Sequence, residues 1–179
     1  MMITTYDILI YVHTLLFVYW LGGDLGVYVS ANYVADRKLS MEERFRFLDV
    51  LWKCDMGPRT ALIAMIPVGF QMSWEMGLSP LGGLYLLAIW LFCLIWLAAN
   101  WWMFFNDRHP TADKIRGVDM VIRYAVIAIM GLMGLVSLVN NSPIVDNWLA
   151  TKIMLFAVAV SLGVYLRGEV KNWVVGFGM

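Results

Sequence analysis

Five apolar segments, each close to the length that crosses a lipid bilayer, constrain most strongly what this chain can fold into. The hydrocarbon core of a bilayer is spanned by about 20 apolar residues in a helix. Most of the charged residues lie in the stretches between these segments. We therefore predict an all-α integral membrane protein, a bundle of five transmembrane helices in a single domain. The predicted spans are about residues 8–34, 58–77, 81–105, 118–139 and 148–166.

The composition supports a membrane protein and gives no indication of a nucleic-acid partner. Of the 179 residues, 61% are hydrophobic and 15% are charged, whereas a soluble domain has about half and about a quarter. The formal net charge is zero, and no basic stripe lies outside the loops, so nothing indicates a nucleic-acid partner. The expected surroundings of the chain are membrane lipids.

The basic residues lie on one side of the five predicted spans. The loops "GLSP" and "NNSPIVDN" and the N-terminal segment contain no lysine or arginine. Cytoplasmic loops of membrane proteins carry an excess of these residues. We therefore predict an extracytoplasmic N-terminus and a cytoplasmic C-terminus in a multi-pass protein of a bacterial-type inner (plasma) membrane. The residues on the basic side are Arg37, Lys38, Arg44, Arg46, Lys53, Arg59, Arg108, Lys114, Arg116, Arg167 and Lys171.

An amphipathic segment precedes the second span. Residues 39–53 carry apolar side chains at helical spacing, which predicts a helix on the cytoplasmic membrane surface. Pro58 is a favourable first-turn residue, so we expect the second spanning helix to begin there. Pro67 is expected to kink that helix. The apolar positions of the surface segment are Phe45, Leu48, Leu51 and Trp52.

Two ionisable residues lie inside predicted spans at matching depths. His13 is six residues past Asp7, about 9 Å along the helix, and Lys152 is five residues past Asn147, about 7–8 Å along. Both positions fall in the outer leaflet. The lysine can snorkel to the headgroups, and a single histidine can be a hydrogen-bonded packing residue. Ionisable groups that face a bundle interior instead mark ligand or proton sites.

An imidazole at this depth suggests a metal or a haem. Neutral histidine is the usual axial ligand of haem iron and also binds copper. His109 belongs to the opposite membrane face and cannot share one iron with His13. A haem would therefore be ligated by one histidine, with the second position open or filled by Lys152 or a methionine.

Two short stretches resemble a known superfamily of small membrane proteins. "HTLLFVYWLGG" contains His13, Trp20, Gly22 and Gly23, and "NWLATKIML" contains Lys152. These stretches resemble motifs of HemJ-type protoporphyrinogen oxidases and CopD-type copper-resistance membrane proteins. The resemblance implies that His13 is a ligand of haem b and that Lys152 is essential, at or near the haem. HemJ-type proteins usually carry that lysine on the third of four helices, whereas here it falls on the fifth span.

Glycines and arginines could complete such a site. Gly22 and Gly23 give either a close helix–helix contact or room for a porphyrin. Arg59 and Arg123 lie at the cytoplasmic starts of their spans. They would anchor the helices at the interface, join an ion-paired cluster with Asp24, or bind haem propionates in a bidentate manner.

Copper handling is the first alternative to a haem function. Met72, Met76 and Glu75 lie at the outer end of the second span, on the same side as His13. Thioethers bind Cu(I), although methionine is also an ordinary apolar filler.

The function expected from the sequence is a haem b-binding membrane protein with a redox or electron-transfer role, of which a haem-dependent oxidoreductase would be one form. The alternatives are a CopD-type copper transport or copper-handling protein and a non-catalytic subunit of a larger membrane complex. The expected partners, besides lipid, are a porphyrin or quinone substrate, a redox partner protein, or further copies of the chain.

Overall fold

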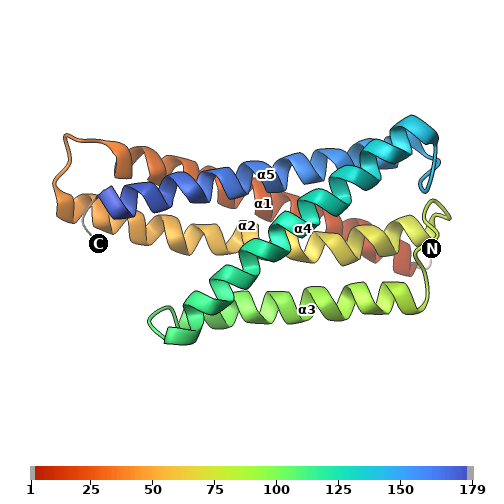
Figure 1. The fold of residues 1–179 in the computed structure, drawn as a ribbon, viewed down its shortest axis with the longest axis horizontal. Helices are drawn as coiled ribbons and strands as arrows, with labels where there is room; N and C mark the ends of the chain where they lie inside the picture. The colour runs from red at the N-terminus through yellow and green to blue at the C-terminus, as the bar shows by residue number, and fades with distance from the viewer. Residues whose placement is uncertain (1–2, 177–179) are drawn as a thin grey trace. The chain divides into compact units, whose positions relative to one another are not determined.

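The computed structural model describes residues 3–176, and the regular structure within them is entirely helical. This confirms the predicted helical class. The loops between the helices are short (Figure 1). The helices are α1 (Thr5–Ala35), α2 (Met41–Glu75), α3 (Leu84–Phe105), α4 (Pro110–Asn140) and α5 (Asn147–Gly176).

Four of these helices are long and apolar enough to cross a membrane: α1, α3, α4 and the part Asn147–Val170 of α5. Their apolar side chains are mostly not covered by other parts of the chain. In α1, only 6% of the most apolar 18-residue stretch is buried. Large apolar surfaces that face outward are unfavourable in water and favourable in lipid. The helices therefore indicate a multi-pass membrane protein in contact with membrane lipid.

Helix α2 differs from the sequence prediction. One continuous helix replaces the expected surface helix at residues 39–53 and the separate span from Pro58, and both Pro58 and Pro67 lie inside it. The helix begins at a capping box, in which Ser40 and Glu43 hydrogen-bond each other's backbone N–H groups. Apolar residues on both sides of Pro58 are buried, so one apolar face continues past the proline.

The chain divides into two compact units, Met1–Met72 and Ser73–Met179. In unit 1, α1 and the part of α2 up to Met72 run antiparallel (Figure 1). Gly23 lies directly against the ring of Pro58, so a Cβ atom on this glycine would overlap the ring. Near the connecting loop, the rings of Tyr33 and Phe47 stack with centroids 4.4 Å apart.

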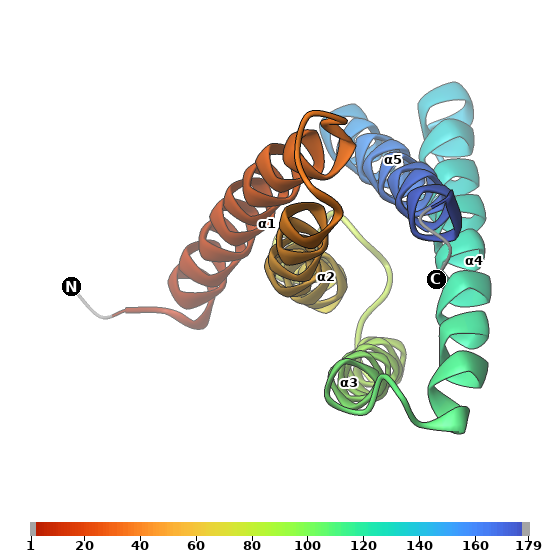
Figure 2. The same cartoon turned by 90° about the vertical axis from the view of Figure 1, so that its left-hand side faces the viewer.

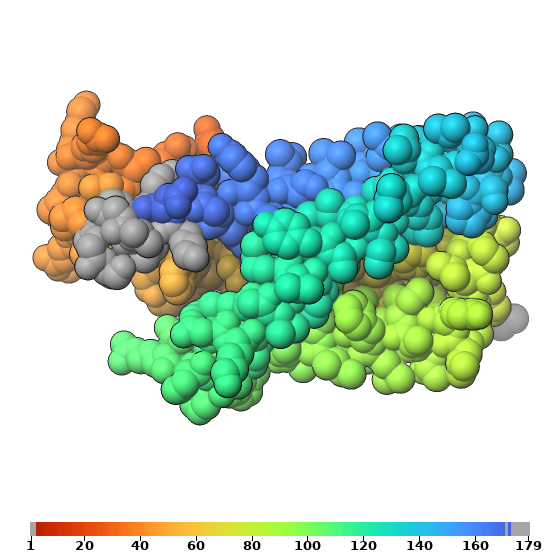
Figure 3. Space-filling view, viewed as in Figure 1, coloured from red at the N-terminus to blue at the C-terminus, as the bar shows by residue number. Residues whose placement is uncertain are grey.

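Unit 2 contains α3, α4 and α5. Helices α4 and α5 lie side by side and make the most extensive contact of this unit (Figure 2). A Cβ atom built on Gly134 would lie 2.9 Å from the Cβ atom of Met154, so the glycine permits this close approach. Helix α4 also packs against α3, and Figure 3 shows the surfaces of these two helices meeting.

A buried charge cluster as candidate functional site

Asp119 and Arg123 form a buried ion pair on α4. Their side chains are 3% and 4% exposed, and Arg123 Nε donates to Asp119 Oδ2 over 2.9 Å. The residues are one helical turn apart, a spacing that places their side chains on the same face. The same oxygen accepts a hydrogen bond of 2.8 Å from Nη1 of Arg167 on α5. Asp119 therefore joins α4 to α5.

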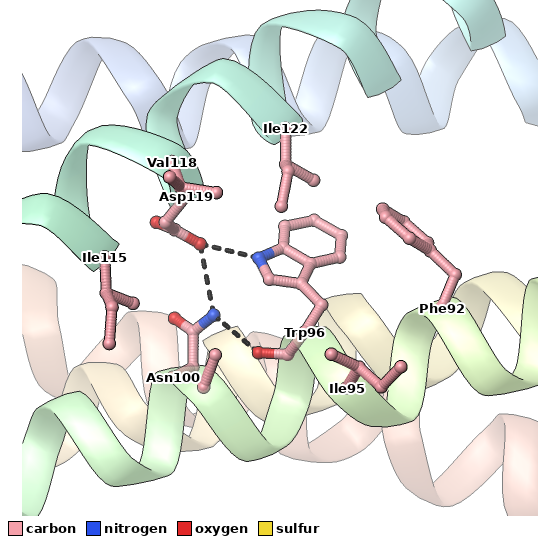
Figure 4. Close-up of a pocket in the computed structure, with 9 residues that line it drawn as sticks. Phe92, Ile95, Trp96, Asn100, Ile115, Val118, Asp119 and Ile122 are labelled. Atoms are coloured by element: carbon pink, nitrogen blue, oxygen red, sulfur yellow. Dashed lines mark hydrogen bonds between the residues drawn. The ribbon is translucent and has the colours of Figure 1, made fainter.

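The second oxygen of Asp119 joins α4 to α3. Oδ1 accepts a hydrogen bond of 2.7 Å from the indole Nε1 of Trp96 and one of 3.1 Å from Nδ2 of Asn100 (Figure 4). Trp96 and Asn100 are also one turn apart, on the face of α3 that is turned toward α4. A single carboxylate thus accepts four hydrogen bonds and connects all three helices of unit 2.

Asp119, Arg123 and Arg167 together carry one more positive than negative charge. The guanidinium of Arg123 lies 5.6 Å from the ring centroid of Trp96, within the range of a cation–π interaction. The Arg167 side chain is 22% exposed and therefore keeps part of its solvation. Two buried polar atoms of the network, Arg123 Nη2 and Asn100 Oδ1, have no hydrogen-bond partner in the described part of the chain.

A pocket of about 160 Å³ lies beside this network, between α3 and α4. Its walls are almost entirely apolar, and Asn100 and Asp119 lie at its edge (Figure 4). The lining residues are Phe92, Ile95, Trp96, Ala99, Asn100, Ile115, Val118, Asp119 and Ile122.

His13 lies on α1 and is half-buried. A Cβ atom on Gly69 of α2 would lie 3.9 Å from its Cε1 atom. The imidazole is therefore in the interface between the two helices of unit 1, beside a position that carries no side chain. This places His13 inside a helix pair, as expected for a functional residue and equally for a packing residue.

Trp20 and Arg59 both bind carboxylates within unit 1. The Trp20 side chain hydrogen-bonds the carboxylate of Asp24 one turn later in α1, and Asp55 lies close enough to repel that carboxylate. Arg59 is held by Asp55 one turn earlier in α2, with Nε 2.6 Å from Oδ2. Arg59 is thus paired with Asp55 and Arg123 with Asp119, and the predicted ion pairing of these arginines with Asp24 stays a prediction.

The two glycines expected beside a porphyrin differ in their surroundings. Gly22 is exposed, and a Cβ atom there would have nothing within 4 Å. Gly23 is in contact with Pro58. The structure therefore gives Gly23 the helix-packing role, which was one of the two predicted roles.

Lys152 is exposed on α5, and its Nζ lies 3.5 Å from the ring centroid of Trp148, one turn earlier. This cation–π contact gives the lysine a partner within its own helix. His13 belongs to unit 1 and Lys152 to unit 2, so their expected meeting across a haem stays a prediction.

The residues suggested for copper are also divided between the units. Met72 ends unit 1 and is half-buried, whereas Glu75 and Met76 belong to unit 2 and are exposed. Across the described residues, no three side chains of histidine, cysteine, aspartate or glutamate gather closely enough to hold a metal ion.

Four residues of this network were not predicted as site residues from the sequence: Asp119, Trp96, Asn100 and Arg167. A signal was present, because Asp119 with Arg123 and Trp96 with Asn100 each have a spacing of four residues within an apolar helix. Two polar positions one turn apart in a spanning helix indicate a polar face that needs partners. For Arg167, no acidic residue at helical spacing in the sequence indicates that it joins this network.

Comparison with known proteins identifies no relative of this chain. No protein-family model, curated protein or solved structure matches it.

Proposed function

We propose that the protein is a multi-pass membrane protein that binds haem b through His13 and has a redox role. The observation that carries this proposal is the position of His13, half-buried in an apolar helix and packed beside Gly69, which has no side chain. A neutral imidazole in apolar surroundings is suited to ligate haem iron. The resemblance of the segment from His13 to Gly23 to HemJ-type proteins supports the same assignment.

Of the residues suggested for a haem, His13 is the one that would hold it. Arg59 and Arg123 are each bound to an aspartate of their own helix, so neither is needed as a propionate ligand. Lys152 has Trp148 as its partner. His13 is therefore the one residue assigned to hold the haem. When bound, the haem would supply a one-electron couple between ferric and ferrous iron, which a redox role requires.

The chain residues around His13 would orient the ligand and limit water. Gly69 adds no side chain beside the imidazole, and the apolar wall of α1 would lower the local polarity, which affects the midpoint potential of a haem. The Asp24 carboxylate lies eleven residues further along α1, about 16 Å along the helix axis. It is therefore too far away to bind the imidazole.

The proposed topology has five spans, with the N-terminus outside and the C-terminus in the cytoplasm. It requires α2 to cross the membrane as well. This is supported by the apolar run at residues 61–70 in its second half and by the basic residues gathered in alternate loops. A reporter active only in the periplasm should be inactive when fused at residue 179. Activity there would overturn this topology.

Absorption spectra of the purified protein, oxidised and then reduced with dithionite, test the haem assignment. We expect the Soret and α bands of a b-type haem in the wild type and their loss or shift in His13→Ala. His109→Ala is the matched control, because His109 is exposed and serves as the N-cap of α4. A wild type without haem bands after expression with added haem precursor, or a spectrum unchanged in His13→Ala, would overturn the proposal.

A further inference from the structure

The pocket between α3 and α4 is an apolar space with a rim that faces outward. Its volume is about 160 Å³, close to that of an apolar cavity in another protein that holds benzene, so it has room for about six carbon atoms. On its rim, Ile95 is 70% exposed and Val118 is 58% exposed. Both lie on helices that are long and apolar enough to cross a membrane. The occupant that fits such a space is a hydrocarbon chain that enters sideways from the bilayer.

The pocket lies in the half of the bilayer next to the α3–α4 loop. Its residues on α3, 92–100, lie about 8–20 Å from the end of that helix, and its residues on α4, 115–122, lie about as far from the start of α4. Trp101 and Trp102, both partly exposed, are closer to the loop than the pocket is. Tryptophans gather at the level of the lipid headgroups, so the pocket begins just below that level, at the depth of acyl chains.

The end of unit 2 beside this pocket is positively charged. With His109 neutral, residues 106–117 hold three basic and two acidic side chains. The buried group of Asp119, Arg123 and Arg167 adds one more positive than negative charge, and Asp119 lies at the edge of the pocket. Both excesses have the same sign, so this end of the unit attracts an anionic headgroup more strongly than a zwitterionic one.

Lys114 is placed to meet such a headgroup. It is exposed and lies one turn before Val118, so it shares the face of α4 that forms the rim of the pocket. Side chains of a helix lean toward its N-terminal end, which for α4 is the loop end. The neighbouring Asp113 is bound by Arg116, and no acidic residue in the described part of the chain forms an ion pair with Lys114.

We propose that unit 2 binds one anionic phospholipid of the membrane, with an acyl chain in the pocket between α3 and α4 and the phosphate at Lys114. The chain contacts the apolar walls alone, and no polar atom of the pocket takes part. Binding is non-covalent. The site contains no residue assigned to hold the haem and does not depend on the haem proposal.

Native mass spectrometry of the purified full-length protein tests this binding. The protein in dodecyl maltoside is mixed with equal amounts of dioleoyl phosphatidylglycerol and dioleoyl phosphatidylcholine, which have the same chains and differ in headgroup charge. Ala99→Leu fills the pocket. Its control is Ala98→Leu, because Ala98 is exposed and does not line the pocket. Lys114→Gln removes the proposed phosphate ligand, and Lys38→Gln makes the same change of charge on an exposed loop of unit 1.

We expect the wild type and both controls to retain one phosphatidylglycerol about fivefold more often than phosphatidylcholine, since that is the usual effect of one basic residue near an anionic lipid. Lys114→Gln should lose most of this preference, and Ala99→Leu should retain neither lipid. If Ala99→Leu is not monodisperse, Ile122→Phe fills the same pocket from α4 and takes its place.

Three outcomes would overturn the inference. Equal or no retention of the two lipids by the wild type would show that the pocket does not select an anionic lipid. A preference that survives in Ala99→Leu or in Lys114→Gln would place the lipid elsewhere on the protein. An equal loss in Lys38→Gln and Lys114→Gln would show an effect of net charge alone. A bound haem is recognised separately by its mass, so the two proposals fail independently.

Discussion

Replacing Asp119 by asparagine measures how strongly the buried carboxylate holds unit 2 together. The amide has nearly the same size, but it cannot accept hydrogen bonds on both sides, so two of the four donors that meet Asp119 lose their acceptor. Arg123, 4% exposed, also keeps a buried charge without a counterion. Removing one partner of a buried ion pair costs about 3–5 kcal/mol. Arg167 is partly exposed and can regain water. We therefore expect Asp119→Asn to lower the free energy of unfolding by about 3 kcal/mol.

The assay is reversible unfolding in mixed micelles of dodecyl maltoside and SDS, followed by far-UV circular dichroism. The matched control is Asp113→Asn on the same helix, which breaks the exposed pair between Asp113 and Arg116 and should change the free energy of unfolding by less than about 0.5 kcal/mol. The double variant Asp119→Leu with Arg123→Met should recover part of the loss, because it removes the uncompensated charge. Equal effects of Asp119→Asn and Asp113→Asn would refute the reasoning.

Substitutions at Gly134, Gly163 and Lys152 test contacts of α5 in the same assay. Gly134→Ala should lower the free energy of unfolding by about 1–3 kcal/mol, because its Cβ atom would lie 3.0 Å from the backbone nitrogen of Met154. Gly163→Ala, where nothing lies within 4 Å, should be neutral or stabilising by up to about 1 kcal/mol, and similar losses in both variants would contradict the packing argument. Lys152→Met should remove a cation–π contact worth about 0.5–1 kcal/mol, and a double-mutant cycle with Trp148→Leu that shows no coupling would exclude that contact.

The helical segments could be predicted from the sequence because apolar runs of spanning length leave the backbone few alternatives. The predicted span 81–105 and the observed helix Leu84–Phe105 end at the same residue. Helix α2 was predicted in two pieces because its charged first half and its two prolines are typical of boundaries. The spacing of Ser40 and Glu43, a capping box, already indicated where the helix begins.

The charge cluster was harder to predict because its members are distant in the sequence. Trp96 and Asp119 are separated by 23 positions, and Asp119 and Arg167 by 48. Periodicity within one helix can show that the helix has a polar face. Which residues of another helix contact that face is decided by how the helices pack. Arg123 was predicted as a site residue because it lies at the start of a span. Asp119, the aspartate that binds it, was not part of that prediction.

The pairing of Asp119 with Arg123 on one helix also bears on how the chain is inserted during synthesis. An arginine in hydrocarbon is costly to dehydrate, but a carboxylate one turn away moves with it, so α4 can enter the bilayer already neutralised. Asp55 and Arg59 have the same arrangement in α2. Arg167 has no acidic residue one turn away in α5, and its partner Asp119 lies on the helix made before it. Arg167 belongs to the cytoplasmic side of the predicted spans and keeps part of its solvation, so we expect its bond to Asp119 to form after both helices have been inserted, as a contact that fixes how the last helix packs on the one before it.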